Sequence, residues 1–319
     1  MAWFPLHLIP HGTKIRFVRF RNLAFVLSAL MIIGSIGLIA TKGLNLGIDF
    51  TGGVLIELRT ETEADLGQMR NLLSDKKFGE VSLQNFGDAR EVLIRIQAND
   101  ENQSEIVAGA KAALDNAIEN IDYRRVEYVG PTVGQELVRA GFTALGLSLL
   151  GMMLYVWFRF EWQYGIGGII ALMHDAIILL GFYAFMGLDF GLSAIAAILT
   201  VIGYSINDSV VIYDRIRENL RKFKKMPIDD LLNLSINETL SRTVLTGGTT
   251  LLALITLALW GGEIIRGFAL AIGFGVVIGT YSSIYIAAPV LSIMHVRNSE
   301  DGVNDAKPAG KNKASGEPA

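Results

Sequence analysis

The sequence FGLSAIAAILTVIGYSINDSVVIY occupies residues 190–213, and Asp208 is the one charged residue within it. An α-helix needs about 20 mostly apolar residues to cross the hydrocarbon core of a bilayer. The stretch meets this requirement, so it predicts a membrane-spanning helix. Its single carboxylate, late in the helix, is the first candidate functional group.

Five more apolar stretches of similar length occur, at residues 22–40, 137–157, 164–186, 243–260 and 266–290. Of all residues 51% are apolar and 18% are charged, against about 25% charged in an average soluble domain. This composition excludes a disordered chain and argues against a soluble globule. We therefore predict a polytopic α-helical membrane protein with six transmembrane helices. The first stretch is too long for a signal-peptide core, so we expect an uncleaved helix.

Basic residues flank these stretches unevenly. Segment 1–21, the predicted cytoplasmic N-terminus, carries four basic residues just before the first stretch, and Arg159 lies between the second and third stretches. Residues 214–242 are predicted as a cytoplasmic loop and carry six more basic residues before Arg242. The two short loops on the other side carry only Arg266. Because cytoplasmic loops are enriched in Lys and Arg, both termini are predicted to be cytoplasmic. The tail at 291–319 is expected to be partly disordered from residue 298 onward.

A polar, acidic segment separates the first two apolar stretches. Residues 41–136 hold 17 acidic and 10 basic residues, a net charge of −7. Alternating apolar residues predict strands, and helical spacing predicts helices. The order strand, helix, strand, strand, helix, strand is that of the ferredoxin-like motif. We predict an extracytoplasmic α+β ferredoxin-like domain at 41–133, with elements at 54–58, 63–77, 80–86, 92–96, 102–120 and 123–129.

Asp208 is the strongest candidate for chemistry within the membrane. A charge at mid-bilayer costs several kcal/mol, so intramembrane ionisable residues are functional candidates by default. Helical spacing places Thr200, Tyr204 and Asp208 on one face, which is able to line a hydrated path. Tyr204 and Asn207 are candidate polar supports. The alternative interpretation is a helix-end carboxylate paired with Arg215 at the interface.

Arg242 opens the fifth apolar stretch, at a depth that should match Asp208. Considered alone, it is a snorkelling anchor of the inner leaflet. Beside a carboxylate, however, an arginine favours the ionised form, whereas burial favours the neutral form. A small rearrangement would then switch Asp208 between two protonation states, which proton coupling requires. We therefore predict a proton-relay pair of Asp208 and Arg242.

His174 and Asp175 lie together near the middle of the third stretch. Adjacent helical residues point about 100° apart, so the two side chains need not form a pair. Interhelical hydrogen bonds are common in membrane bundles, so a structural polar cluster is one interpretation. Participation in the functional site is the other, and the residues alone leave both open.

Two glycine motifs flank the acidic domain. Gly52 and Gly53 precede it, and Gly130, Pro131 and Gly134 follow it. Glycine permits bends and proline fixes a turn, so these residues are hinge candidates. Ordinary linkers of a tethered domain are the alternative.

Five motifs in this order carry a resemblance to a known family. They are Asp49–Gly53, Gly130–Gly134, Leu172–Asp175, Tyr204–Asn219 and Ser241–Thr243, and the fourth is the most specific. The chain resembles the SecD/SecF family of bacterial protein-translocase subunits, of the resistance-nodulation-division type. This resemblance assigns the family's proton-linked pair to Asp208 and Arg242.

The resemblance implies a function in the Sec pathway and a location in a bacterial inner membrane. It implies a complex with SecD and the SecYEG translocon, with YajC as a further candidate partner. It also implies that the proton-motive force promotes export of unfolded polypeptides. The proton is then the coupling ion, and no other cofactor, no metal and no enzymatic activity are expected. A nucleic-acid partner is disfavoured because no basic face with interleaved aromatics occurs.

Three other functions are weighed against this one. The first is an exporter of small molecules or lipids from the same superfamily. A full exporter would be expected to have twelve spans and large outer domains, whereas this chain has six stretches and one small domain, so the alternative here is a half-size exporter. An intramembrane aspartyl protease would use Asp175 and Asp208 as a dyad, but it leaves Arg242 unexplained. A passive scaffold would tolerate loss of Asp208. The absence of cysteine excludes thiolate chemistry and disulfides.

Overall fold

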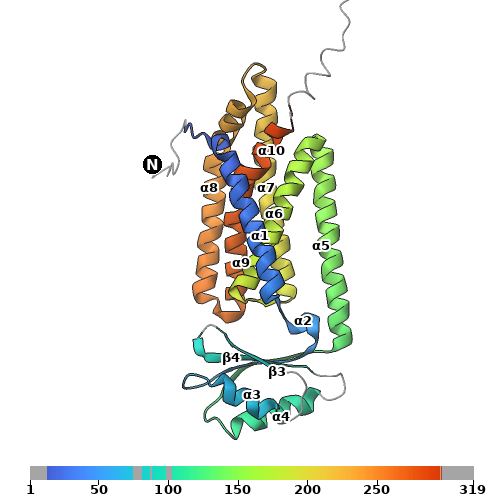
Figure 1. The fold of residues 1–319 in the computed structure, drawn as a ribbon, viewed down its shortest axis with the longest axis vertical. Coiled ribbons are helices and arrows are strands. Elements are labelled where there is room, and N and C mark those ends of the chain that lie inside the picture. The colour runs from blue at the N-terminus through green and yellow to red at the C-terminus, as the bar shows by residue number, and fades with distance from the viewer. Residues whose placement is uncertain (1–12, 75–80, 87, 98–102, 295, 297–319) are drawn as a thin grey trace, which may run out of the picture.

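The structure is a computed structural model that describes residues 13–74, 81–86, 88–97, 103–294 and 296. The first twelve residues and the tail predicted to be disordered from residue 298 lie outside this part. Within the described residues, six helices are long and apolar enough to cross a membrane. An α+β domain is inserted between the first two of them (Figure 1). The predicted fold class is confirmed.

The membrane bundle is an antiparallel array of long helices. A short 3₁₀ helix, Phe17–Phe20, precedes the first of them. The last helix passes through a π-helical segment, Ser283–Ala287, into a short final helix. The long helices are α1 (Arg21–Lys42), α5 (Pro131–Arg159), α6 (Trp162–Met186), α7 (Leu192–Lys222), α8 (Ile228–Trp260) and α9 (Gly262–Ser282), and the final one is α10 (Ala288–Ile293).

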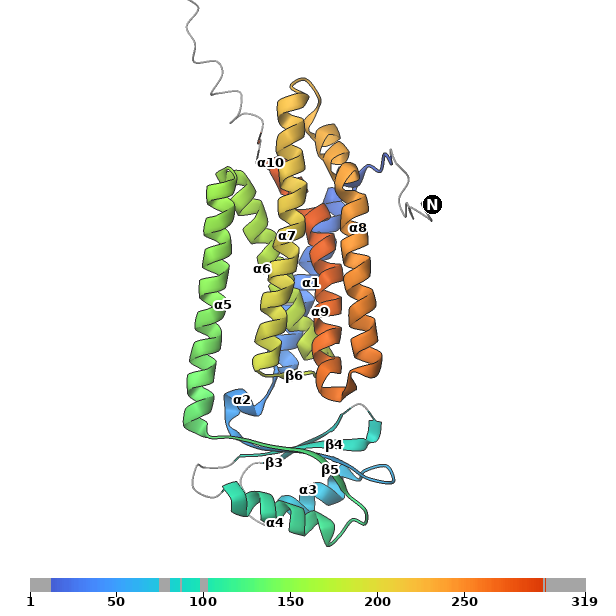
Figure 2. The same ribbon diagram turned by 180° about the vertical axis from the view of Figure 1, so that it is seen from behind.

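Helices α7 and α8 are longer than their apolar stretches. Residues 214–242 are predicted as a loop, but most of them are helical. Helix α7 continues to Lys222 and α8 begins at Ile228, so five residues lie between the two helices. Hydropathy locates the apolar part of a helix and not its ends, which here are polar. Asp229 and Asp230 in the first turn of α8 favour its start electrostatically. The two extensions form a helical hairpin at the end of the bundle opposite the α+β domain (Figure 2).

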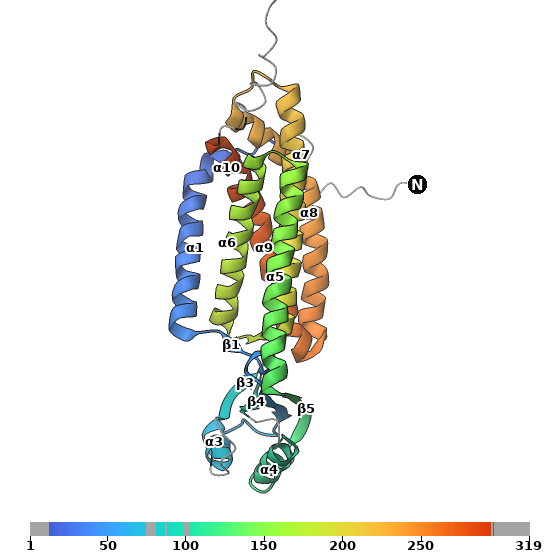
Figure 3. The same ribbon diagram turned by 90° about the vertical axis from the view of Figure 1, so that its right-hand side faces the viewer.

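The bundle has an inner and an outer set of helices. About half of each apolar window is buried in α6, α7 and α9, against 6–17% in α1, α5 and α8. Helix α1 lies at the left edge of the bundle in Figure 3, and α5 lies at its right edge in Figure 1. Small residues bring α7 and α9 close together, since a Cβ on Gly279 would lie 3.0 Å from the Cβ of Ser205. The candidate residues of α6 and α7 therefore lie on inner helices.

The α+β domain contains a four-stranded antiparallel sheet in the order β3-β4-β2-β5. Helices α3 and α4 cover the face that points away from the bundle (Figure 1). Val54, Ile56 and Leu58 of β2 are fully buried in that layer, as their alternation predicts. The elements are β2 (Gly53–Arg59), α3 (Leu66–Ser74), β3 (Val81–Phe86), β4 (Asp88–Ile96), α4 (Gln103–Asp115) and β5 (Asp122–Val129).

The second face of the sheet is also covered. Leu55 and Leu93 are buried there against Ile48 of a short helix, α2 (Ile48–Thr51). Even Glu57, at 5% exposure, is buried. A sheet of which one face is open to solvent would show alternate exposed residues along β2. The burial of Leu55 and Glu57 instead shows that this face of the sheet is part of the junction with the membrane bundle.

Candidate functional site

Asp208 lies on α7 and faces α8. Its side chain is buried, and Oδ1 accepts a hydrogen bond of 2.7 Å from the hydroxyl of Thr243. The other oxygen, Oδ2, is buried without a hydrogen-bond partner among the described residues. Buried polar atoms are nearly always paired, so an exception calls for a functional or structural explanation. This oxygen is the atom on which the carboxyl can carry a proton without breaking the bond to Thr243.

Arg242 is not in ion-pair contact with Asp208 in this structure. It is exposed, while its neighbour Thr243 is buried and bonded to the carboxylate. Adjacent helical residues diverge by about 100°, so only one of the two can face α7. Any influence of Arg242 on Asp208 in this arrangement therefore acts at a distance, through its charge. Sequence reasoning missed Thr243, although it stands in the same three-residue motif.

Tyr204 and Asn207, the two residues of α7 that are predicted to support Asp208, do not both face α8. Tyr204 is half-buried, and its hydroxyl would lie 3.4 Å from a Cβ placed on Gly247 of α8. Tyr204 and Asp208 therefore face the same helix. Asn207 and Thr200 are exposed, and the Thr200 hydroxyl bonds its own helix at Ala196. The face shared with α8 thus contains Tyr204 and Asp208 and not Asn207.

His174 and Asp175 form a pair at the centre of the bundle. The carboxylate of Asp175 is fully buried, and Nδ1 of His174 lies 2.9 Å from its Oδ1. Its Oδ2 accepts hydrogen bonds from Ser205 of α7 at 2.5 Å and from Ser282 of α9 at 2.8 Å. Nε2 of His174 is buried without a partner in the described part of the chain. The pair therefore joins α6, α7 and α9 through one carboxylate.

Further hydroxyl contacts extend this network to the π-helical segment. The hydroxyls of Ser209 and Ser283 lie 2.8 Å apart, and Ser283 donates to the carbonyl of Ser205 at 3.3 Å. A π-helical turn inside an α-helix is uncommon and often marks a functional site. Sequence reasoning did not select these serines. The available signal was their occurrence in otherwise apolar stretches, where a buried hydroxyl requires a partner.

The two membrane carboxylates are not paired with each other. Asp175 bonds residues of α6, α7 and α9, whereas Asp208 bonds α8, and no hydrogen bond joins them among the described residues. The dyad that an aspartyl protease needs is absent from this part of the chain. Across the same residues, no three His, Asp or Glu side chains are placed to hold a metal ion.

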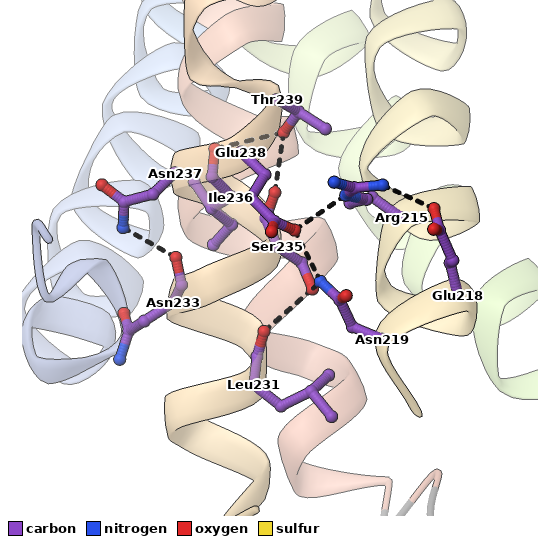
Figure 4. Close-up of polar contacts among 10 residues, drawn as sticks. All are labelled: Arg215, Glu218, Asn219, Leu231, Asn233, Ser235, Ile236, Asn237, Glu238 and Thr239. Carbon is purple, nitrogen blue, oxygen red and sulfur yellow. Dashed lines mark hydrogen bonds and ion pairs between the residues drawn. The ribbon is translucent and has the colours of Figure 1, made fainter. Parts of the chain in front are cut away.

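Arg215 has other partners than Asp208. It bonds Glu218 at 2.6 Å and Glu238 of α8 at 2.7 Å (Figure 4). Asn219 donates to Ser235 at 3.0 Å and to the same Glu238 oxygen at 2.8 Å. The alternative pairing of Asp208 with Arg215 is therefore not seen. These contacts fasten the α7–α8 hairpin beyond Asp208 and hold together the two helices that contribute Asp208 and Thr243.

The hinge candidates meet where the α+β domain joins α5. Gly52 and Gly53 adopt φ angles of +69° and +115°, which favour glycine. A Cβ on Gly134 would lie 3.4 Å from backbone atoms of Asp49 and Gly52, so α5 packs tightly on α2. Gly130 precedes α5, which begins at Pro131. In this structure Gly52 and Gly53 adopt backbone angles that other residues rarely adopt, and Gly134 allows α5 to approach α2 closely.

Comparison with known proteins gives a consistent result. The family model "Protein export membrane protein SecD/SecF, C-terminal" matches residues 110–297. The model "SecD/SecF GG Motif" matches residues 37–64, which include Gly52 and Gly53. Protein translocase subunit SecF of Rickettsia bellii is 48% identical over 295 residues, which are 92% of this chain and 97% of the relative. The Rickettsia rickettsii SecF is 49% identical, with 92% and 96% covered.

A solved structure shares both fold and sequence with this chain. It is SecDF from Thermus thermophilus, described as a translocon-associated membrane protein. The TM-score is 0.81 at 36% identity, over 90% of this chain and 39% of that one. This chain thus spans about two fifths of the SecDF chain. The chain belongs to the SecF protein-translocase subunits of the SecD/SecF family, and it is a multi-pass membrane transport protein rather than an enzyme.

Proposed function

We propose that this subunit couples the proton-motive force to the export of unfolded polypeptides, and that Asp208 carries the proton. The observation that supports this most directly is the state of its carboxyl group. One oxygen is bonded to Thr243 and the other is buried without a partner among the described residues. Such a group can gain and lose a proton while its place between α7 and α8 is kept.

The energetics suit this role. One charge moved through 100 mV supplies about 2.3 kcal/mol. Ionised Asp208 only accepts hydrogen bonds, whereas the protonated form also donates one, so the two states favour different arrangements of α7 against α8. We propose that the positive charge of Arg242, which is adjacent to Thr243 on α8, favours the ionised state of Asp208.

We assign His174 and Asp175 to polar support of the site. Asp175 has three hydrogen-bond donors from three helices and no exposed surface, which suits a fixed structural carboxylate. Ser205, one of the donors, lies one helical turn before Asp208. The pair thereby fixes the α7 segment that carries the proton site. Tyr204 has the same supporting role on the face toward α8.

The proposed partners are SecD, the SecYEG translocon, YajC and the exported polypeptide. The outer helices α1, α5 and α8 expose large apolar side chains along their length, which lipid or other membrane subunits would cover. Six spans are half of the twelve expected for a pseudo-symmetric transporter. A homologous six-span partner would supply the other half.

We place the protein in a bacterial inner membrane with both termini in the cytoplasm. The basic α7–α8 hairpin and the acidic α+β domain lie at opposite ends of the bundle, which supports this orientation (Figure 2). Cysteines introduced at Lys222 and Asp88 are both expected to be exposed on the folded protein. In whole cells a membrane-impermeant thiol reagent should label position 88 and not position 222. The native chain, which lacks cysteine, is the control, and the opposite labelling would reverse the topology.

Export in membrane vesicles tests the function itself. Vesicles with and without this subunit are compared, each with an intact proton gradient and with a protonophore. The subunit should raise the export rate only while the gradient is present. An equal gain in the presence of the protonophore would exclude proton coupling and leave a scaffold role.

A further inference from the structure

The first turn of α7 is capped by a residue from another part of the chain. Its own N-cap is Gly191, which has no side chain, and the amide of Leu192 donates instead to Oδ2 of Asp49 at 2.9 Å. A Cβ on residue 191 would lie 2.5 Å from that oxygen, so the glycine makes the approach possible. A carboxylate at a helix N-terminus satisfies unpaired amides and is favoured by the helix dipole.

Backbone pairing joins the same two regions. Strand β1 (Asn45–Leu46) precedes Asp49 and pairs in parallel with β6 (Asp189–Phe190), which precedes α7. The amide of Gly47 extends the pairing by donating to Phe190 at 3.0 Å. The segment that leads into the α+β domain is therefore bonded along its length to the segment that leads into α7.

Arg95 adds a link from the centre of the sheet. It lies on β4, and its guanidinium donates to Asn45 at 2.6 Å and to Asp189 at 2.5 Å. Although part of the Asp189 side chain stays exposed, burial of its carboxyl raises the pKa, with a smaller opposing effect of Arg95. Ion pairs that lose hydration in this way add little net stability, but they fix geometry.

We propose that Asp49, Arg95 and Asp189 are positioning residues that fasten the α+β domain to α7, so that the two move as one body during export. This inference rests on the proposed role of Asp208. Asp208 lies 16 residues beyond Leu192 on the same helix, a rise of about 24 Å. If protonation of Asp208 displaces α7, the four-stranded sheet at the other end of α7 therefore moves with it.

A reversible covalent link tests the proposal. Asn45 and Asp189 are paired residues of adjacent strands, whose spacing of about 4.8 Å suits a disulfide. The double variant N45C/D189C removes both partners of Arg95, and the native chain adds no other cysteine. Reduced, it should show gradient-driven export that is slower by about two- to thirtyfold, which is the range that typical changes in coupling energy produce. Oxidised, it should return to the wild-type rate.

Two outcomes would overturn the proposal. If the oxidised protein assembles but exports slowly, the junction has to open during the cycle. If the reduced protein exports at the wild-type rate, these contacts carry no coupling. Asp88→Asn is the matched control, because it removes an exposed ion pair with Arg90 in the same domain and should leave export unchanged.

A second pair of variants addresses the cap directly. Asp49→Ala should slow export to the same extent as the reduced double variant, and Asp49→Asn should restore much of the rate because asparagine also caps helices. All variants are measured with and without protonophore. If Asp208→Asn keeps full gradient dependence, the proton role fails, whereas the ratio of oxidised to reduced rates still decides whether the junction positions α7.

Discussion

Asp208→Asn is expected to abolish the gradient-dependent part of export while the protein reaches the membrane at the wild-type level. The asparagine carbonyl can still accept the Thr243 hydrogen bond, and the side chain has the same size. The amide cannot ionise, however, so the two protonation states that differ in their hydrogen bonding no longer exist. Export rates with and without protonophore, at matched protein levels, measure the effect.

Companion variants separate the proton role from packing. Asp208→Glu keeps an ionisable group and should retain part of the activity. Arg242→Lys keeps the charge but loses the planar guanidinium, so an intermediate rate is expected. Thr243→Val removes the hydroxyl that holds the carboxylate and should reduce the rate although no charge changes. Full gradient dependence in Asp208→Asn, with normal assembly, would show that the proton is carried elsewhere.

The membrane architecture was predictable because a span is a local property. Each helix satisfies its own backbone hydrogen bonds, and lipid requires only that its side chains be apolar. The stretch at 190–213 therefore indicates α7 without knowledge of any neighbour. Its end was predicted less well, since the polar residues up to Lys222 continue the helix into the hairpin with α8.

The candidate site was predictable only in part. A lone carboxylate in an apolar helix identifies Asp208, but its partner depends on the rotation of α8. That rotation turns Thr243 inward and Arg242 outward, a difference that adjacent letters in a sequence do not reveal. The same holds for Ser205 and Ser282, which meet Asp175 from helices that are distant in sequence.

The junction at the α+β domain shows the same limit more sharply. Gly52 and Gly53 stood out in the sequence, while Asp49 beside them stood out only as part of a motif. Its contact with Leu192 joins residues that are 143 positions apart, and nothing in the local pattern indicates it. Long-range caps of this kind become visible only when the fold has placed one helix end against another segment.

Asp175→Ala is expected to have the largest effect on stability. It leaves Ser205, Ser282 and His174 without their shared acceptor at a fully buried position. A buried donor left without an acceptor costs about 1–3 kcal/mol, and three donors lose their acceptor here, so this variant should be destabilised by more than that amount. Asp175→Asn keeps one carbonyl acceptor and should destabilise less, by about 1–3 kcal/mol. Thermal unfolding of the purified protein in detergent and its level in the membrane measure both changes.

The matched control is Asp214→Ala. Asp214 forms an exposed ion pair with Arg159 at 2.9 Å, and its side chain keeps 58% of its surface accessible. Exposed pairs of this kind contribute about 0–1 kcal/mol, so this variant should unfold close to the wild-type temperature. A stable Asp175→Ala would contradict the supporting role of the pair. If Asp175→Asn is stable but has lost gradient-dependent export, His174 and Asp175 lie in the proton path instead. In that case the bundle requires the ionisable group at this position, and not only its packing and hydrogen bonds.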